Sequence, residues 1–457
     1  MARRGISDFF VEQNKASWVP LWGSRVIVSP SRTLAWFISV GLWLGPFVLV
    51  AQVQLGDCEK AGAPSAQVLK AEGALAKGDR PMAQVYMSSI RRKEPESIHG
   101  WYLDAELALL VGEERAALAL YERVFAACPD YLGDLAFRIG ALHAGQGRRA
   151  EAQRYWASPN AGAEARRWLR RFELEDSLRA HPVPFNPEPI EGLATSADEF
   201  LAVRSPDGSK WYLTRRRNVV DRKSGPAART YLEEALCEGI PQHGGVEVRP
   251  LEHPFNAGLN EGGPSVSADD HWMVLTVCAP DANGYRNCDL FVAHRELGEW
   301  STLRRIDEVS TPTHWESQGA LSANGDRIIF SSDRPGGRGG LDLWTTQRNP
   351  DGSWTQPENL GPAVNTDGDE KSPFLHADGK TLFFSSDGHP GMGGLDVFYT
   401  NWATPMQPIN LGYPINTEGD ELGFGVHANE PLGYFSQRRE GSGYDLMRFA
   451  LPADAAG

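Results

Sequence analysis

The chain has 457 residues, of which 41% are hydrophobic and 23% are charged, and its formal net charge is −14. This length and composition indicate a globular protein of two or more domains with enough apolar residues to build sizeable cores. The acidic balance argues against a nucleic-acid-binding protein, because such a protein presents a basic face.

The N-terminal region contains a predicted membrane anchor. Residues 1–32 form a polar tail with an excess of positive charge, and residues 33–55 follow without one charged side chain. Such a run is long enough to span a bilayer, and the preceding positive charges predict a cytoplasmic N-terminus, with the bulk of the chain on the periplasmic side of a bacterial inner membrane. A cleaved signal peptide lacks a clear cleavage site here, and Asp57 before Cys58 counts against a lipoprotein. Residues 56–64 are expected to be a linker.

Residues 65–180 are predicted to form helical repeats, because Ala, Leu, Glu and Arg recur there with helical periodicity. Five positions recur after 34 residues, and a third, degenerate copy follows. The first two copies are Gly78, Ala83, Met87, Ile90 and Pro95, then Gly112, Ala117, Tyr121, Val124 and Pro129. The period and pattern resemble tetratricopeptide repeats, which implies a concave protein-binding surface; a plain helical bundle is the alternative.

The C-terminal part repeats one sequence unit. The segment from Glu316 to Trp344 returns 54 residues later, and weaker copies begin at Glu199, Glu261 and Glu421. Each copy predicts four short antiparallel strands joined by tight turns and glycine-rich loops, as in a β-propeller blade. Five copies, the fourth starting at Glu370, predict five blades. The alternative of a sixth blade would place it in residues 216–245, which are too few and are helix-like at 229–237.

The ring is expected to close through the N-terminal end of the propeller. The last copy stops after its third strand near Ala450, and residues 185–193 precede the first copy without a partner. This segment is therefore predicted to complete the last blade and to leave no exposed sheet edge. The predicted fold class is an α+β multidomain protein, with a transmembrane helix, tetratricopeptide-like repeats, and a propeller over residues 181–453 that has an insertion at 216–247.

The propeller motif resembles a known family. The run Ser331-Ser-Asp-Arg-Pro-Gly-Gly-Arg-Gly-Gly-Leu-Asp-Leu-Trp344 is similar to the WD40-like (PD40, TolB-type) repeats of bacterial envelope proteins. Helical repeats followed by such a propeller resemble the OmpA-family lipoprotein of the type IX secretion and gliding apparatus. That family adds a peptidoglycan-binding domain after the propeller, where this chain ends at Gly457. The resemblance implies partners among other proteins of a membrane or envelope complex. The predicted anchor adds the inner membrane as a partner, and the acidic charge predicts no nucleic-acid partner.

The repeated carboxylates are interpreted as blade architecture. Hard cations favour clustered oxygens, so residues 365–370 and 416–421 also allow a calcium interpretation, but they lack the spacing of an EF-hand. Repetition in every blade favours turns and seams over chemistry. The expected structural motif is Glu199, Glu261, Glu316, Glu370 and Glu421 with Asp289, Asp342, Asp396 and Asp445.

Other site chemistry is not indicated by the sequence. No motif of a catalytic, cofactor-binding or metal site is found, so none is expected. Cys278 and Cys288 flank a turn between adjacent predicted strands, which is a geometry that a disulfide can close. Cys58 and Cys237 stay unassigned.

The main functional prediction is a non-catalytic, membrane-anchored periplasmic scaffold. It would be a structural subunit of a large membrane or envelope assembly, either a secretion or motility machine or a bioenergetic complex, including a photosynthetic one. The alternative is a receptor for a glycan or cation, or an enzyme, that uses the central channel of the propeller. Residues near the five repeated glutamates would then line the site.

Overall fold

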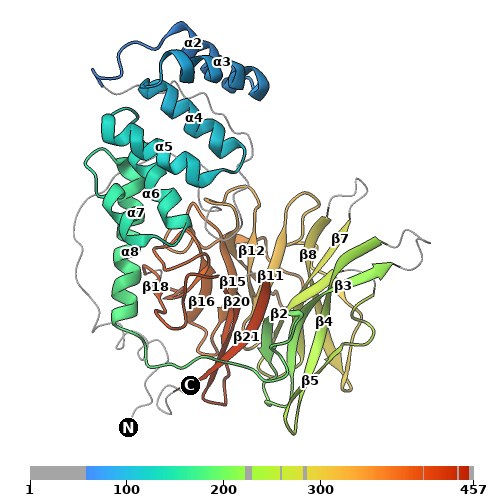
Figure 1. The fold of residues 1–457 in the computed structure, drawn as a ribbon. Coiled ribbons are helices and arrows are strands. Elements are labelled where there is room, and N and C mark those ends of the chain that lie inside the picture. The colour runs from blue at the N-terminus through green and yellow to red at the C-terminus, as the bar shows by residue number, and fades with distance from the viewer. Residues whose placement is uncertain are drawn as a thin grey trace. The chain divides into compact units, whose positions relative to one another are not determined.

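Figure 1 shows a computed structural model of the chain, which describes residues 58–221, 229–257, 260–280, 286–404, 406–439 and 442–451. The described residues divide into two compact units, one up to Glu173 and the other from Leu174 onward.

The first unit is built from paired helices. The first three described helices begin at side-chain caps: Ser65 accepts from the amide of Val68, Asp79 from that of Met82, and Ser97 from that of Gly100. The helices of the described chain are α2 (Ala66–Ala76), α3 (Arg80–Lys93), α4 (Ile98–Leu110), α5 (Glu114–Ala127), α6 (Leu135–Gly145), α7 (Arg149–Trp156) and α8 (Gly162–Ala180), the last of which ends in the second unit.

The core of the helical unit includes a disulfide that the sequence left unassigned. Cys58 is bonded to Cys128 at the end of α5, and both pack against a cluster that contains Tyr121, Tyr131 and Ile139. The 70 residues between the two cysteines explain why neither spacing nor a local motif indicates the pair.

The second unit contains five antiparallel sheets, each with one inner strand and successively more peripheral strands. The first two sheets are β2 (Asp198–Arg204), β3 (Trp211–Asp221), β4 (Arg229–Gln242) and β5 (Gly245–Pro250), then β6 (Asn260–Val266), β7 (Trp272–Pro280), β8 (Arg286–Glu296) and β10 (Arg304–Arg305), with β9 (Glu299–Trp300) on β8. The third and fourth are β11 (Glu316–Leu321), β12 (Arg327–Ser332), β13 (Asp342–Gln347) and β14 (Glu358–Asn359), then β15 (Glu370–Leu375), β16 (Thr381–Ser386), β17 (Asp396–Asn401) and β18 (Ile409–Asn410). The fifth is β19 (Glu421–Val426), β20 (Leu432–Arg439), β21 (Ser442–Ala450) and β1 (Glu188–Pro189).

The inner strands form a closed ring. Each of β2, β6, β11, β15 and β19 contacts the next, and β19 returns to β2. The fifth sheet is completed from the other end of the propeller, because β1 pairs with β21 and places Glu188 opposite Arg448. The five-bladed propeller and its closure by residues 185–193 are therefore confirmed.

Two sequence-based expectations are corrected by the described residues. Residues 229–237 are not helical but belong to β4, which pairs with β3 along a long hairpin from Trp211 to Gly239 onward. Alternating Arg and Glu residues across this hairpin, such as Arg216 with Glu234 at 2.6 Å, satisfy one another there, so the polar composition that suggested a helix suits paired strands.

No helix in the described part of the chain is both long and apolar enough to cross a bilayer. The described residues therefore give no support to the predicted single-pass inner-membrane location, and that prediction is not carried forward. The tail at 1–32 and the segment at 33–55 on which that prediction depended lie outside the described residues.

Candidate functional site

A β-bulge recurs in every inner strand of the propeller. Two residues after each repeated glutamate, the backbone takes a left-handed conformation, and the pairing register shifts there. The five residues and their φ values are Leu201 (50°), Gly263 (57°), Gln318 (55°), Ser372 (49°) and Gly423 (59°). Bulges of this kind change the direction in which the following side chains point. Non-glycine residues with a positive φ are uncommon.

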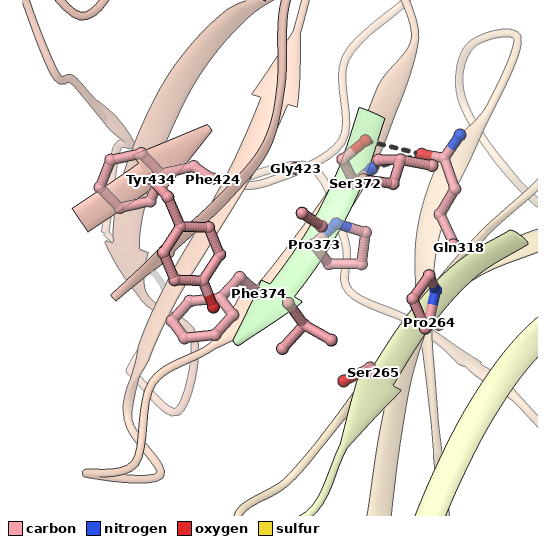
Figure 2. Close-up of a pocket in the computed structure, with 14 residues that line it drawn as sticks. Pro264, Ser265, Gln318, Ser372, Pro373, Phe374, Gly423, Phe424 and Tyr434 are labelled. Carbon is pink, nitrogen blue, oxygen red and sulfur yellow. Dashed lines mark hydrogen bonds between the residues drawn. The ribbon is translucent and has the colours of Figure 1, made fainter. Parts of the chain in front are cut away.

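These five bulges surround a small cavity at the centre of the ring. Its volume is about 40 Å³, which leaves room for a few water-sized groups. Figure 2 shows Phe374, Phe424 and Tyr434 toward one side and Gln318 with Ser265 toward the other. The lining residues come from all five inner strands, so the cavity lies in the central channel.

The lining of the cavity is uncharged. None of its 14 residues is an acid, a histidine, a lysine or an arginine. Burial raises the pKa of Tyr434 to about 12, so its phenol is neutral at physiological pH. The lining therefore offers apolar surface and hydrogen-bonding groups, and no charged side chain.

Gln318 and Ser372 form the polar contact that crosses this cavity. The Ser372 amide donates to Gln318 Oε1 at 2.8 Å, and the Ser372 hydroxyl donates to the same oxygen at 2.7 Å (Figure 2). Both donors face the carboxamide oxygen, which fixes the orientation of the Gln318 amide.

The five predicted glutamates do not line the cavity. Each is buried, and its carboxylate instead binds the loop that enters its own blade. Glu370 is representative: it accepts from the Thr366 amide at 2.8 Å, from the Thr366 hydroxyl at 2.6 Å and from Ser386 at 2.8 Å. The others have equivalent partners, namely Thr195 with Glu199, Asn256 with Glu261, Thr311 with Glu316 and Thr417 with Glu421.

Burial also raises the pKa of four of these carboxyl groups. It raises the pKa of Glu370 to about 7 and that of Glu421 to about 8, and the nearby negative charges of Asp342 and Asp396 add to the effect. The pKa values of Glu261 and Glu316 are raised as well, mainly by burial.

The predicted aspartates lie on the loops and peripheral strands of the blades. Asp342 accepts from the amides of Arg338 and Gly339, and Asp396 accepts from those of Met392 and Gly393, so each stabilises a glycine-rich loop. Asp289 pairs with Arg305 at 3.1 Å, and Asp445 lies opposite Gln437 in the β20–β21 register.

The acidic loops that allowed a calcium interpretation hold basic partners. Asp369 pairs with Lys371 at 2.8 Å, and Asp420 pairs with Arg438 at 2.8 Å. Among the described residues, no group of three or more His, Cys, Asp or Glu side chains is arranged to hold a metal ion.

Cys278 and Cys288 are directly opposite each other in β7 and β8 and form a disulfide. Cys237 is a buried free thiol whose pKa is raised to about 11 by burial.

The alternative prediction placed a channel site near the five repeated glutamates, and all the lining residues except Tyr434 lie two to four positions after one of them. That prediction did not name the lining residues individually. It concentrated on positions that repeat in every blade, and those positions build the blades. The signal was present at the second position after each glutamate, where the copies differ as Leu, Gly, Gln, Ser and Gly within an otherwise shared motif.

No protein-family model and no curated protein matches the chain. Among solved structures, a puromycin-hydrolysing peptidase of Mycobacterium tuberculosis is 14% identical over 58% of this chain and 38% of its own length, with a TM-score of 0.34. A glycosyl hydrolase from Bacteroides ovatus is 12% identical over 58% of this chain and 90% of its own, with a TM-score of 0.36. A sialidase of Trypanosoma rangeli is 8% identical over 60% of each chain, with a TM-score of 0.35. At these identities the likeness shows the fold alone.

The comparisons correct the predicted class of function. The neighbours named above are a peptidase, a glycosyl hydrolase and a sialidase, and none of them is named as a non-catalytic scaffold. The predictions of a scaffold and of no enzymatic activity are therefore not carried forward. They depended on the absence of catalytic sequence motifs and on the resemblance of the repeats to those of envelope proteins.

Proposed function

We propose that the protein receives a small neutral polyhydroxy ligand, such as the end of a glycan, in the central channel of its propeller, as a receptor or as an enzyme. The observation that carries this proposal is the uncharged cavity with an apolar wall at Phe374, Phe424 and Tyr434 and hydrogen-bonding groups at Gln318 and Ser372. Ligand sites in proteins typically combine such apolar linings with a few placed polar groups.

The chemistry of the lining selects this ligand class. A sugar presents apolar C–H faces and a rim of hydroxyl groups, which complements one aromatic wall and one hydrogen-bonding wall. An ion would find no opposite charge among the lining residues. The volume of about 40 Å³ is far below the roughly 300–1,000 Å³ of sites that enclose a whole drug-sized ligand, so the cavity admits only a few atoms at the end of a larger molecule.

The test is to fill the channel. Leu201 lines the cavity in a left-handed conformation, and Leu201→Trp is expected to abolish binding of neutral mono- and disaccharides, measured by calorimetry and ligand-observed NMR. Leu297→Trp is the matched control, because Leu297 is also left-handed, with φ of 52°, but is fully exposed in the β8–β9 turn.

Binding by the wild type and by Leu201→Trp alike would place the ligand elsewhere and overturn the proposal. The same sugars are assayed for cleavage or isomerisation by the wild type. Turnover that Leu201→Trp abolishes identifies an enzyme, and saturable binding without turnover identifies a receptor.

We infer an oxidising, non-cytoplasmic location for the protein. The two disulfides, Cys58–Cys128 and Cys278–Cys288, support this inference, because structural disulfides persist mainly in such compartments.

We also infer that the helical unit is of the tetratricopeptide type and that the propeller is of the PD40 type. Three helix pairs support the first inference, since α2–α3, α4–α5 and α6–α7 are each joined through a left-handed glycine, Gly78, Gly112 and Gly147, with φ of 71°, 80° and 71°. The repeated Gly-Leu-Asp loops that bind their own aspartate support the second.

A further inference from the structure

Three of the five seams between blades are closed by the same hydrogen bond. In each, a Ser or Thr hydroxyl on the second strand of one blade accepts from the amide of the left-handed residue in the next blade. The pairs are Thr214 with Gly263 at 2.8 Å, Thr276 with Gln318 at 2.9 Å, and Ser436 with Leu201 at 3.0 Å. Every hydroxyl lies fifteen residues after the glutamate of its own blade.

The seam between the third and fourth blades departs from this pattern. Ser331 occupies the hydroxyl position and is fully buried, but its hydroxyl has no hydrogen-bond partner among the described residues. The amide that it would be expected to bind, that of Ser372, instead donates to the side chain of Gln318. The Gln318 carboxamide therefore replaces the seam hydroxyl at this position (Figure 2).

The amide of Ser372 therefore has two possible acceptors, the side-chain oxygen of Gln318, which it binds, and the hydroxyl of Ser331, which has no partner among the described residues. A buried hydroxyl without a partner costs free energy, and a bond from Ser372 N–H to Ser331 Oγ would recover it. The Gln318 side chain belongs to the lining of the cavity and has rotatable bonds, so it is able to leave Ser372 for a ligand. A carboxamide offers one acceptor and two donors, which matches the hydroxyl groups of a sugar.

We propose that Gln318 is the specificity-determining residue of the channel and a two-position latch. Without ligand, it holds the amide of Ser372. With ligand, its carboxamide binds the ligand hydroxyls, and Ser372 N–H transfers to Ser331 Oγ, as in the three regular seams. The ligand half of this proposal rests on the proposed function, whereas the latch half does not.

The latch is tested without any ligand by a double-mutant cycle. Gln318→Met keeps the length of the side chain and removes its acceptor, so Ser372 N–H should move to Ser331. Ser331→Ala is then expected to leave the thermal unfolding midpoint unchanged or raised in the wild type, and to lower it in the Gln318→Met background. Ser385→Ala is the matched control, because Ser385 is the equivalent residue of the next seam and is likewise buried without a partner among the described residues. Its effect should be the same in both backgrounds.

Equal effects of Ser331→Ala in the two backgrounds would overturn the latch.

The role of Gln318 in ligand binding is tested with the neutral sugar that binds the wild type most tightly. Gln318→Met should weaken its Kd by about threefold to tenfold, the range expected for a lost neutral hydrogen bond. Unchanged affinity would overturn the specificity role of Gln318. Absence of sugar binding by the wild type would overturn the proposed function and the ligand half with it, while the double-mutant cycle would still decide the latch.

Discussion

Two buried glutamates of the blades, Glu370 and Glu421, combine local hydrogen bonds with pKa values near neutral pH. Glu421 is fully buried, accepts from Thr417 and Gln437, and lies near the negative charge of Asp396. The hydrogen bonds favour its charged form, but burial and the neighbouring carboxylate outweigh them, and the pKa rises from its usual 4.5 to about 8. The folded state therefore holds this proton more tightly than the unfolded chain does.

The sign of the pH dependence follows from the raised pKa of Glu421. The stabilisation by the bound proton is complete below pH 4.5 and is lost as the pH rises through about 8. We expect the free energy of unfolding of the wild type to fall by about 1–3 kcal/mol between pH 5 and pH 8, and that of Glu421→Gln to fall less. Urea unfolding at stepped pH measures both. Exposed Glu59→Gln should keep the wild-type slope, and an identical slope for Glu421→Gln would contradict the assignment.

At the scale of elements, the packing of α6 against α7 requires a glycine at position 140. Gly140 lies in α6 directly beneath Trp156 of α7, and a Cβ at this position would overlap the indole ring. The indole is also bound to α6 by a hydrogen bond, because its N–H donates to the carbonyl of Phe137 in that helix at 3.0 Å. The ring is therefore unable to move away without losing this bond.

Two substitutions in α6 separate packing from helix propensity. Gly140→Ala is expected to destabilise the helical unit by about 1–3 kcal/mol through overpacking. Gly145→Ala lies in the same helix, where a Cβ meets open space, and should be neutral or stabilising by up to about 1 kcal/mol. Thermal unfolding followed by circular dichroism compares the two, and equal effects would contradict the role of the Trp156 contact.

Elements were more predictable from the sequence than sites. The five glutamates mark the inner strands, because the same side-chain-to-loop hydrogen bond is needed in every blade. The number of blades, and the absence of a fourth strand at the end of the last copy, could therefore be predicted from the sequence. Residues 229–237 were misread as a helix because their Glu and Ala composition has no strand signal without the cross-strand partners Arg215 and Arg216. The Cys58–Cys128 bond and the central cavity depend on contacts between residues distant in sequence, which periodicity does not reveal.

At the scale of the whole propeller, closure depends on the segment that carries β1. Phe185 is buried, and its ring lies 4.8 Å from that of Phe449 in β21, measured between ring centroids. Val183 joins the same core, and its amide donates to the carbonyl of Tyr413 at 2.7 Å. The two-residue strand itself is short, so most of the closure energy comes from these apolar contacts.

Truncation of Phe185 tests this assignment. Phe185→Ala is expected to cost about 3–5 kcal/mol in the free energy of unfolding, and to increase hydrogen exchange in β20 and β21 more than in β11 and β12. Urea unfolding and exchange mass spectrometry provide the two measurements. Met406→Ala, at a side chain that is 55% exposed, is the control. A stability loss spread evenly over all blades would argue against closure at the fifth blade.

The pairing of β1 with β21 also determines when the ring is able to form during synthesis. Glu188 meets Arg448 across 260 residues of chain. At about 5–20 residues per second, a ribosome adds that length in roughly 13–52 seconds. During this interval β1 has been made but its partner has not, and the first four blades carry an open edge. The ring is therefore unable to close before Arg448 has been synthesised, and until then its open sheet edge is a template for pairing with another chain.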